Sequence, residues 1–416
     1  MKSFLSIVFL LVCSPLLRAQ QRNDVIIGSI DSINSSILKE QRKIWVHVPP
    51  SFRSQNSDAK KYPVIYLLDA EKNYTGVVGM VDLLSSMNGN DLFPEMIIVG
   101  IPNTNRTRDL TPTQVTNGLW IDSYTASVSG GGEAFISFIE KELIPHIDSL
   151  FPTTPYRTLI GHSYGGLTVM NTIVHHKNIF NAYIAIDPSM WWDKQRLLHE
   201  AEQVLKKDHY ENTTLFLAMA NTLPPGIDTT TVQKDTSDGT LHPRSILSLS
   251  RYVLNNRQNG IQSGFNYYKE DTHGSIPLIA TYDALHFIFN DYAMKIEDGY
   301  FIDPEFKLAD FIEKHFKHIS WKYGFTDKNG GPLSPPEDLL YNLGYFVSTK
   351  KQFSKAEDLY KMNIKYHPES ANVYDHLGDL YSEEGDLSHA KANYKKALSL
   401  KEIPETRQKM EKLGKK

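Results

Sequence analysis

One short segment of the sequence places a serine between glycines, Gly161-His162-Ser163-Tyr164-Gly165. An apolar run precedes it and an apolar pattern with helical spacing follows, so the serine lies on a predicted strand–turn–helix. This turn is strained, and side chains at 161 and 165 would collide with the neighbouring strand and helix. It lifts the hydroxyl out at the sheet edge and aims the Tyr164 backbone N–H at a developing oxyanion. The segment therefore predicts Ser163 as a nucleophile.

A serine nucleophile needs a base, which is usually a histidine, and the chain has 15 of them. The base is expected on a loop after the last strands of the sheet. His273 lies directly after the predicted strand 265–269, so we predict that it is the base. His242, in a polar insert, is the alternative. His286 falls within a predicted helix, where it would be packed or exposed, and His162 points along the serine turn and is interpreted as structural.

The acid that orients the base is less clearly marked in the sequence. We predict Asp228, which follows the strand ending near residue 220. Asp235 follows the same strand, and Asp187 follows an earlier strand. Asp271 is only two residues from His273, and a residue so close seldom reaches the far ring nitrogen. A serine–histidine pair without an acid is the remaining alternative.

The elements that must position these residues alternate between strands and helices. Nearly unbroken apolar runs are typical of buried parallel strands, and helical patterns separate them. This order predicts an α/β fold with a mostly parallel central sheet, in the manner of the α/β-hydrolases. The predicted strands are 25–30, 43–48, 63–68, 96–101, 158–161, 183–186, 215–219 and 265–269, and a helix is predicted over 133–150. Residues 221–244 form a long polar insert, interpreted as disordered or as a flap.

The last eighty residues repeat themselves. Leu343-Gly344 recurs 34 residues later as Leu377-Gly378, and alanines and tyrosines recur at the same interval. This period resembles tetratricopeptide repeats, in which paired helices stack. We therefore expect two repeats with a cap helix over 337–416, an all-α region able to bind a protein or peptide. The aromatic-rich segment 293–336 would connect them to the sheet, with the first repeat packed through 293–325.

The N-terminus has the pattern of a signal peptide over residues 1–20. Lys2 precedes an apolar run that is too short for a membrane span, and Ala19 is a plausible cleavage position. We therefore expect a secreted or periplasmic protein with no integral membrane span. Cleavage there would remove Cys13, the only cysteine, whose possible lipid attachment stays open. Thiol catalysis and thiolate metal sites would then be excluded.

Composition limits the remaining partners. Charged residues make up 22% of the 416-residue chain and the formal net charge is −4, so no basic face for nucleic acid is indicated. The length suits a domain of roughly 270 residues, 21–292, plus a smaller one.

Several separated motifs, in order, resemble the esterase family that includes esterase D and the siderophore esterases. They are residues 66–70, 101–112, 161–166, 187–192 and 273–278. The resemblance implies hydrolysis of carboxylic esters, such as siderophore trilactones or acyl sugars, without a metal or cofactor. It also implies that the Ala70 backbone N–H is the second oxyanion donor.

Two pairs of residues in these motifs could bind substrate. Trp191 and Trp192 could line an acyl or aryl pocket or belong to the core. Arg106 and Arg108 could bind an anionic substrate or pair with Asp109 or Asp82. Two other functions remain compatible with the sequence: acyl transfer, and a catalytically silent hydrolase scaffold that acts through its repeats.

Overall fold

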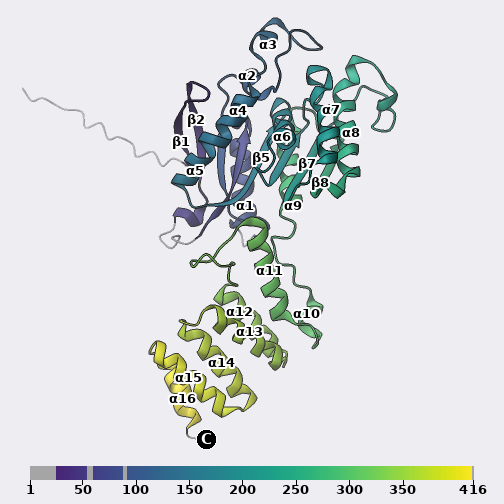
Figure 1. The fold of residues 1–416 in the computed structure, drawn as a ribbon. Helices are drawn as coiled ribbons and strands as arrows, with labels where there is room; N and C mark the ends of the chain where they lie inside the picture. The colour runs from purple at the N-terminus through teal and green to yellow at the C-terminus, as the bar shows by residue number, and fades with distance from the viewer. Residues whose placement is uncertain (1–24, 54–59, 88–90, 415–416) are drawn as a thin grey trace, which may run out of the picture.

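The computed structural model describes residues 25–53, 60–87 and 91–414. The predicted signal peptide, its Ala19 cleavage position and Cys13 lie outside the described residues. The chain forms an α/β region, a connecting segment built around one long helix, and a helical-repeat region that ends at the C-terminus (Figure 1).

The α/β region is organised around an eight-stranded sheet with the order β1-β2-β4-β3-β5-β6-β7-β8. β1 and β2 are antiparallel, and β2 is also antiparallel to β4, whereas the strands from β4 to β8 all run parallel. This confirms the predicted α/β fold with a mostly parallel sheet. The strands are β1 (Ser29–Ser35), β2 (Glu40–His47), β3 (Tyr62–Leu68), β4 (Ile97–Ile101), β5 (Thr153–His162), β6 (Ala182–Ile186), β7 (Thr213–Ala220) and β8 (Ile261–Tyr268).

Helices cover both faces of this sheet, so its central strands are buried on both sides. In β3, Tyr66 faces one apolar core and its neighbours Ile65 and Leu67 face the other. Helices α4, α6 and α7 pack on the first face, and α1 and α9 on the second (Figure 1). The helices are α1 (Ala70–Ser85), α2 (Arg106–Leu110), α3 (Ser123–Val128), α4 (Gly132–Phe138), α5 (Ile144–Leu150), α6 (Tyr164–His175), α7 (Trp192–Lys207), α8 (Leu241–Asn255) and α9 (Ile276–Ile288), with short turns η1 (Pro50–Arg53), η4 (Val232–Lys234), η5 (Asp238–Thr240) and η6 (Arg257–Asn259).

Several predicted elements differ in detail from the structure. The first strand begins at Ser29 rather than at 25, β5 at Thr153 rather than at 158, and β8 at Ile261 rather than at 265. The predicted helix 133–150 is continuous but contains a π-helical turn, η3 (Ile139–Leu143), between α4 and α5. Pro145 follows this turn, and because proline lacks an N–H and crowds the preceding turn, a wider turn accommodates it.

The polar insert 221–244 is ordered. Val232 of η4 is fully buried with Met219, Ile246 and Leu247. The insert ends at α8, whose second residue is His242. Of the two interpretations of the insert, the structure thus shows a packed segment, and its Gly239 borders the cavity that contains Ser163.

The connecting segment contains α10 (Asp298–Ile302) and α11 (Leu308–Tyr323), and α11 packs at both ends. Ile319 and Tyr323 belong to the core beneath the sheet, and Leu308 and Ile312 belong to the core of the repeats. The first repeat therefore packs through the aromatic segment, as predicted.

The repeat region consists of two helix pairs and a fifth helix. They are α12 (Glu337–Thr349), α13 (Phe353–Tyr366), α14 (Ala371–Glu384), α15 (Leu387–Leu400) and α16 (Pro404–Leu413). A Cβ on Gly344 would lie 2.6 Å from the Tyr360 ring, and a Cβ on Gly378 would lie 2.6 Å from the Tyr394 ring. The two helix pairs thus use the same glycine–tyrosine contact, which explains the 34-residue recurrence.

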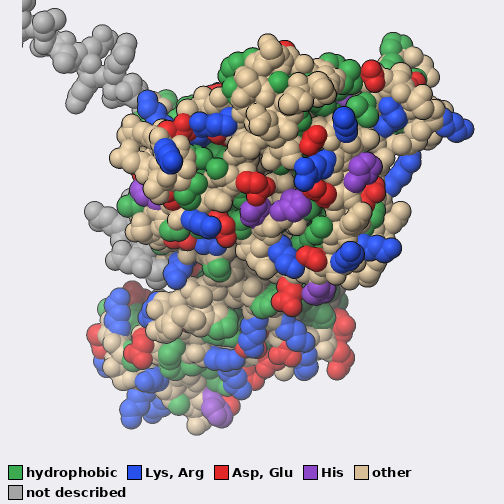
Figure 2. Space-filling model, turned by 45° about the horizontal axis from the view of Figure 1, so that its top comes forward, with side chains coloured by type: hydrophobic (Ala, Val, Ile, Leu, Met, Phe, Trp, Pro, Cys, Tyr) green, Lys and Arg blue, Asp and Glu red, His purple; other side chains and the backbone are tan. Residues whose placement is uncertain are grey.

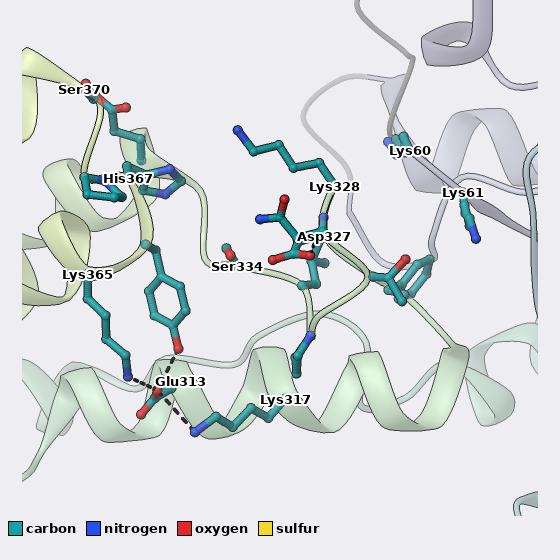
Figure 3. A pocket seen from close by; sticks show the side chains of 18 of the residues that line it. Lys60, Lys61, Glu313, Lys317, Asp327, Lys328, Ser334, Lys365, His367 and Ser370 are labelled. Carbon is teal, nitrogen blue, oxygen red and sulfur yellow. Dashed lines mark hydrogen bonds and ion pairs between the residues drawn. The ribbon is translucent and has the colours of Figure 1, made fainter.

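A groove of about 1260 Å³ lies where the α/β region, α11 and the first repeat meet. Figure 3 shows Lys317, Lys365 and a tyrosine converging on Glu313 of α11. Within the part of the chain that the structure describes, the groove and the cavity that contains Ser163 have no lining residue in common.

Charges of both signs are interspersed over the face drawn in Figure 2, in keeping with the small net charge. Among the described residues, none of the helices combines the length and apolar character needed to cross a bilayer.

Candidate active site

Ser163 lies in a strained turn between β5 and α6. Its φ of 61° and ψ of −116° are rare for a residue with a side chain, and its backbone N–H donates to Ile186 of β6 at 3.0 Å. A Cβ on Gly161 would lie 2.3 Å from the Gly165 carbonyl oxygen, so no larger residue fits there. The second close contact was predicted at Gly165, but a Cβ there would lie 3.3 Å from its nearest neighbour. It occurs instead at Gly166, where a Cβ would lie 2.9 Å from Pro188.

The loop after β8 brings His273 to the same cavity as Ser163. The loop is fixed because the Asn221 backbone N–H donates to the Asp271 carbonyl at 2.8 Å, and the Asp271 side chain accepts from Ser275 at 2.8 Å. Nδ1 of His273 lies 2.6 Å from Oδ2 of Asp187. Since Nδ1 donates to this carboxylate, Nε2 is the ring nitrogen left to accept a proton.

Asp187 follows β6 directly and is fully buried. Its Oδ1 accepts the Ala220 backbone N–H at 2.9 Å, and its Oδ2 is 3.0 Å from Nε2 of His242 and 2.6 Å from Nδ1 of His273. Burial alone would raise the pKa of Asp187, but the hydrogen bonds from the two histidines hold it well below its usual range. The carboxylate is therefore ionised at neutral pH.

The prediction of Asp228 as the orienting acid is wrong in its geometry. Its Oδ1 accepts hydrogen bonds from Thr230 and Thr231 in its own exposed turn. Asp235 likewise caps its own turn, and Asp271 holds the loop. A strand end can deliver a carboxylate to a loop far along the chain, whereas Asp228 is already satisfied locally. Asp187, one of the stated alternatives, is the residue that contacts His273.

His242 and His162 flank His273. The rings of His242 and His273 are nearly perpendicular, at 84° and 5.6 Å between centroids, and the His162 ring lies 4.4 Å from that of His273. Burial, with a contribution from the neighbouring His273, lowers the pKa of His162 to about 4, so this ring is neutral at physiological pH. His286 packs against Phe93 and Tyr282, away from these residues, as a structural residue should.

The two predicted oxyanion donors are the first residues of two helices. Ala70 begins α1 after β3, and Tyr164 begins α6 after β5. These strands are parallel neighbours, so both helices start at the same edge of the sheet. The first N–H groups of a helix have no partner within it and can bind an anion.

Arg106 supports this edge. Its guanidinium donates two hydrogen bonds to Asp69, at 2.6 and 2.9 Å, and a third to the His162 carbonyl at 3.2 Å. Burial would raise the pKa of Asp69, but Arg106 outweighs it and the pKa is lowered. The predicted substrate-binding role of Arg106 is therefore replaced by an ion pair beside Ala70. Its partner is Asp69, not the expected Asp109 or Asp82; Arg108 does pair with Asp109, at 2.7 Å.

The cavity beside Ser163 has a volume of about 360 Å³ and an aromatic wall. Trp191 and Tyr164 line it, and Trp120 contributes a third ring, 5.0 Å from Trp191 in an edge-to-face arrangement. Trp192 instead is buried and donates its ring N–H to Thr113 at 3.1 Å. The tryptophan pair thus divides into one cavity residue and one core residue.

A known family model covers most of the α/β region. Residues 35–239 match the family model described as Putative esterase. This segment belongs to that esterase family. The tail agrees as well, because residues 371–404 match a tetratricopeptide repeat model. The resemblance predicted from the motifs is confirmed. The matched segment contains Ser163, Asp187 and the two predicted oxyanion donors, whereas His242 and His273 lie beyond it.

The esterase segment has curated and structural relatives. The ferri-bacillibactin esterase BesA of Bacillus subtilis is 32% identical over 163 residues, which are 37% of this chain and 54% of that protein. The chain spans between about a third and just over half of the first curated relatives it matches. The structure of an IroE-like serine hydrolase from Shewanella oneidensis is 28% identical with a TM-score of 0.64, covering 82% of this chain and 99% of that one.

A further structure resembles the chain almost throughout. An uncharacterised protein from Capnocytophaga ochracea covers 94% of this chain and 100% of its own, with a TM-score of 0.67 and 18% identity. At that identity the likeness concerns the fold alone.

The sequence patterns did not mark five residues that line the cavity, which are Trp120, Ser189, Thr222, Gly239 and Pro243, and they did not identify His242 as a partner of Asp187. Ser189 Oγ lies 3.5 Å from Ser163 Oγ. A signal for His242 existed, since it was the rival base. Trp120 and Ser189 carry no local pattern that marks them.

Proposed function

We propose that this protein is a serine carboxylic ester hydrolase, with Ser163 as nucleophile, His273 as base and Asp187 as orienting acid. Ser163 Oγ attacks the acyl carbonyl while its proton passes to Nε2 of His273. The backbone N–H groups of Ala70 and Tyr164 hold the oxyanion. His273 then protonates the departing alcohol, leaving an acyl group on Ser163. Water, deprotonated by the same nitrogen, releases the carboxylic acid and restores the serine.

The contact between Asp187 and His273 carries this proposal. A buried, ionised carboxylate on Nδ1 fixes the imidazole tautomer and stabilises the imidazolium that forms during attack. A histidine that is oriented in this way and lines the same cavity as Ser163 can act as the base that activates the serine.

The aromatic wall supports an acyl group with a flat ring as the preferred substrate. Trp120, Trp191 and Tyr164 offer ring faces and edges, and aromatic pairs gain from such contacts beyond simple burial. The relatives named as siderophore esterases make catecholate trilactones the first compounds to test, with feruloyl and acetyl sugars next.

A fluorophosphonate probe tests the chemistry directly. It should label the wild-type protein on Ser163 and leave Ser163→Ala unlabelled. The matched control is Ser189→Ala, which keeps the nucleophile and should still be labelled. Absence of labelling in the folded wild type would refute a serine mechanism. Turnover of an ester panel, with an added alcohol to detect acyl transfer, then defines the substrate class.

We further propose that the protein is exported and that its repeats bind a protein or peptide. The first point rests on the pattern of residues 1–20, and the second on the matched repeat. N-terminal sequencing of the exported protein should begin at Gln20 if cleavage follows Ala19. Retention of residues 1–20 in the mature protein would count against export by this route.

A further inference from the structure

We infer that Asp187, His242 and His273 form a Zn²⁺ site that switches the active site off. Each of the three residues offers one ligand atom, and these atoms lie within 4.8 Å of one another. Two imidazoles and a carboxylate are a ligand set that zinc accepts in proteins, with a fourth position left open. Metal binding does not depend on the proposed function, whereas inhibition by the metal rests on it.

The geometry requires only a small adjustment. Nε2 of His242 and Nδ1 of His273 converge on the same atom, Oδ2 of Asp187, at 3.0 and 2.6 Å. In tetrahedral zinc sites with bonds near 2.05 Å, neighbouring ligand atoms lie roughly 3.3 Å apart. The His242 nitrogen would therefore retreat from the oxygen by about 0.3 Å and the His273 nitrogen by about 0.7 Å, with the ion taking the place of the two shared protons.

The three ligands come from separate, well-anchored elements. Asp187 directly follows β6, His242 is the second residue of α8, and His273 lies on the loop after β8. The Ala220 backbone N–H on Oδ1 holds the carboxylate, which is the kind of outer-shell support that metal-binding carboxylates have. The His273 side chain is 43% exposed and lines the cavity together with His242, which gives an ion a route to the site and water a route to the fourth position.

The reaction itself leaves His242 unexplained. Catalysis by Ser163 and His273 needs one imidazole on the orienting carboxylate, and His242 adds a second. His242 is only 8% exposed, and its Nδ1 is buried and has no hydrogen-bond partner among the described residues. Coordination through Nε2 would move the proton to this Nδ1, which lowers the affinity and favours reversible rather than permanent binding.

The inhibitory effect follows from the histidine tautomer. Zinc on Nδ1 of His273 uses the lone pair of that nitrogen, so the neutral ring must carry its proton on Nε2. Nε2 then donates and cannot accept the proton of Ser163. The ion also replaces the hydrogen bond between His273 and Asp187. An occupied site would therefore lack a base.

Binding can be measured without any activity. Zinc chloride is titrated by calorimetry into the full-length Ser163→Ala variant, and Co²⁺ absorption serves as a second readout of a tetrahedral site. We expect one ion per chain with a Kd in the micromolar range. Adding His242→Gln or His273→Gln should weaken binding by at least ~30-fold, whereas His389→Gln, at an exposed histidine on α15, should not.

Inhibition is then tested on the wild type. Zinc should suppress both ester turnover and fluorophosphonate labelling, and EDTA should restore both. Equal zinc affinity in the His242→Gln and parent proteins would overturn the inference. So would tight binding that leaves labelling unchanged. Zinc binding to a wild-type chain that the probe never labels would instead sink the proposed function and leave the metal site standing.

Discussion

Oδ2 of Asp187 lies 2.6 Å from Nδ1 of His273, although 86 residues separate them along the chain. Asp187 directly follows β6, which lies next to β5 in the sheet, so the acid approaches the histidine from beside the serine. The backbone of Asp187 is itself held, since its N–H donates to the Ala218 carbonyl at 2.8 Å and its φ is 41°. The acid is thus rigid, while its partner histidine is partly exposed.

Replacing this acid should be costly. Asp187→Asn should lower kcat for an aryl ester by ~10³–10⁴-fold, because the amide stabilises the wrong tautomer of His273. Asp228→Asn should change kcat less than about threefold, because its carboxylate serves only its own turn. Stopped-flow or steady-state assays with p-nitrophenyl acetate measure kcat, and circular dichroism confirms that the variants are folded. Similar losses in both variants would reject Asp187 as the orienting acid.

Ser163→Ala and His273→Ala should be non-additive. The two side chains act in one proton transfer, so the double variant should be little slower than either single variant. His242→Ala should retain measurable turnover, because Nε2 of His242 is engaged with Asp187. If His273→Ala stayed near wild type while His242→Ala did not, the roles of the two histidines would have to be exchanged.

Trp191 lines the cavity and Trp192 is buried in the core, so the two substitutions should have different effects. Trp191→Ala should raise KM for aromatic acyl esters more than for acetyl esters, because it removes a ring from the cavity wall. Trp192→Ala should instead destabilise the protein by about 3–5 kcal/mol, since its ring is buried. Paired KM values and urea unfolding midpoints distinguish the two effects. A Trp191 variant with unchanged substrate preference would argue against aryl recognition.

Local sequence patterns predict some residues of this site, whereas others depend on the order of the strands in the sheet. Ser163 and His273 stand out because a strained turn and a post-strand loop each need particular residues in a short stretch. The acid could not be chosen locally, since Asp187 and Asp228 both follow strands and only the sheet order decides which one meets the histidine. Likewise, Gly344 and Gly378 mark the repeats, but nothing local shows that Trp191 faces the cavity and Trp192 the core.

Asp291 should make the docking of α11 dependent on pH. It accepts hydrogen bonds from Lys322 and from Tyr323 at the base of the sheet region. Burial raises the pKa of Asp291, but the donors His318, Tyr323 and Lys322 outweigh it and hold it at about 2. Because this is below the unfolded value, the stabilisation is complete above pH 4 and is lost as pH falls toward 2.

The corresponding variant is Asp291→Asn. It should lower the free energy of unfolding by about 1–2 kcal/mol at pH 7, a figure reduced for a carboxylate that is one-third exposed, and by much less at pH 2.5. Urea unfolding at both pH values measures this. Asp310→Asn on α11, an exposed carboxylate, is the control. A deficit that is equal at both pH values would mean that packing, not charge, holds the helix.

Removal of the repeats should spare the chemistry and reduce solubility. A chain truncated after Asp327 keeps α11, whose Tyr323 is buried beneath the sheet, but it bares Leu308 and Ile312, which the repeats normally cover. No candidate site residue lies beyond Asp327, so labelling of Ser163 should persist, while the exposed apolar surface should promote association. Sedimentation together with probe labelling measures both effects. Full solubility and activity would show that the repeats are an independent module, because their apolar contact with α11 would then be dispensable. A folded but inactive product would show that the repeats help to shape the candidate active site, even though none of the described residues lines both the groove at the junction and the cavity that contains Ser163.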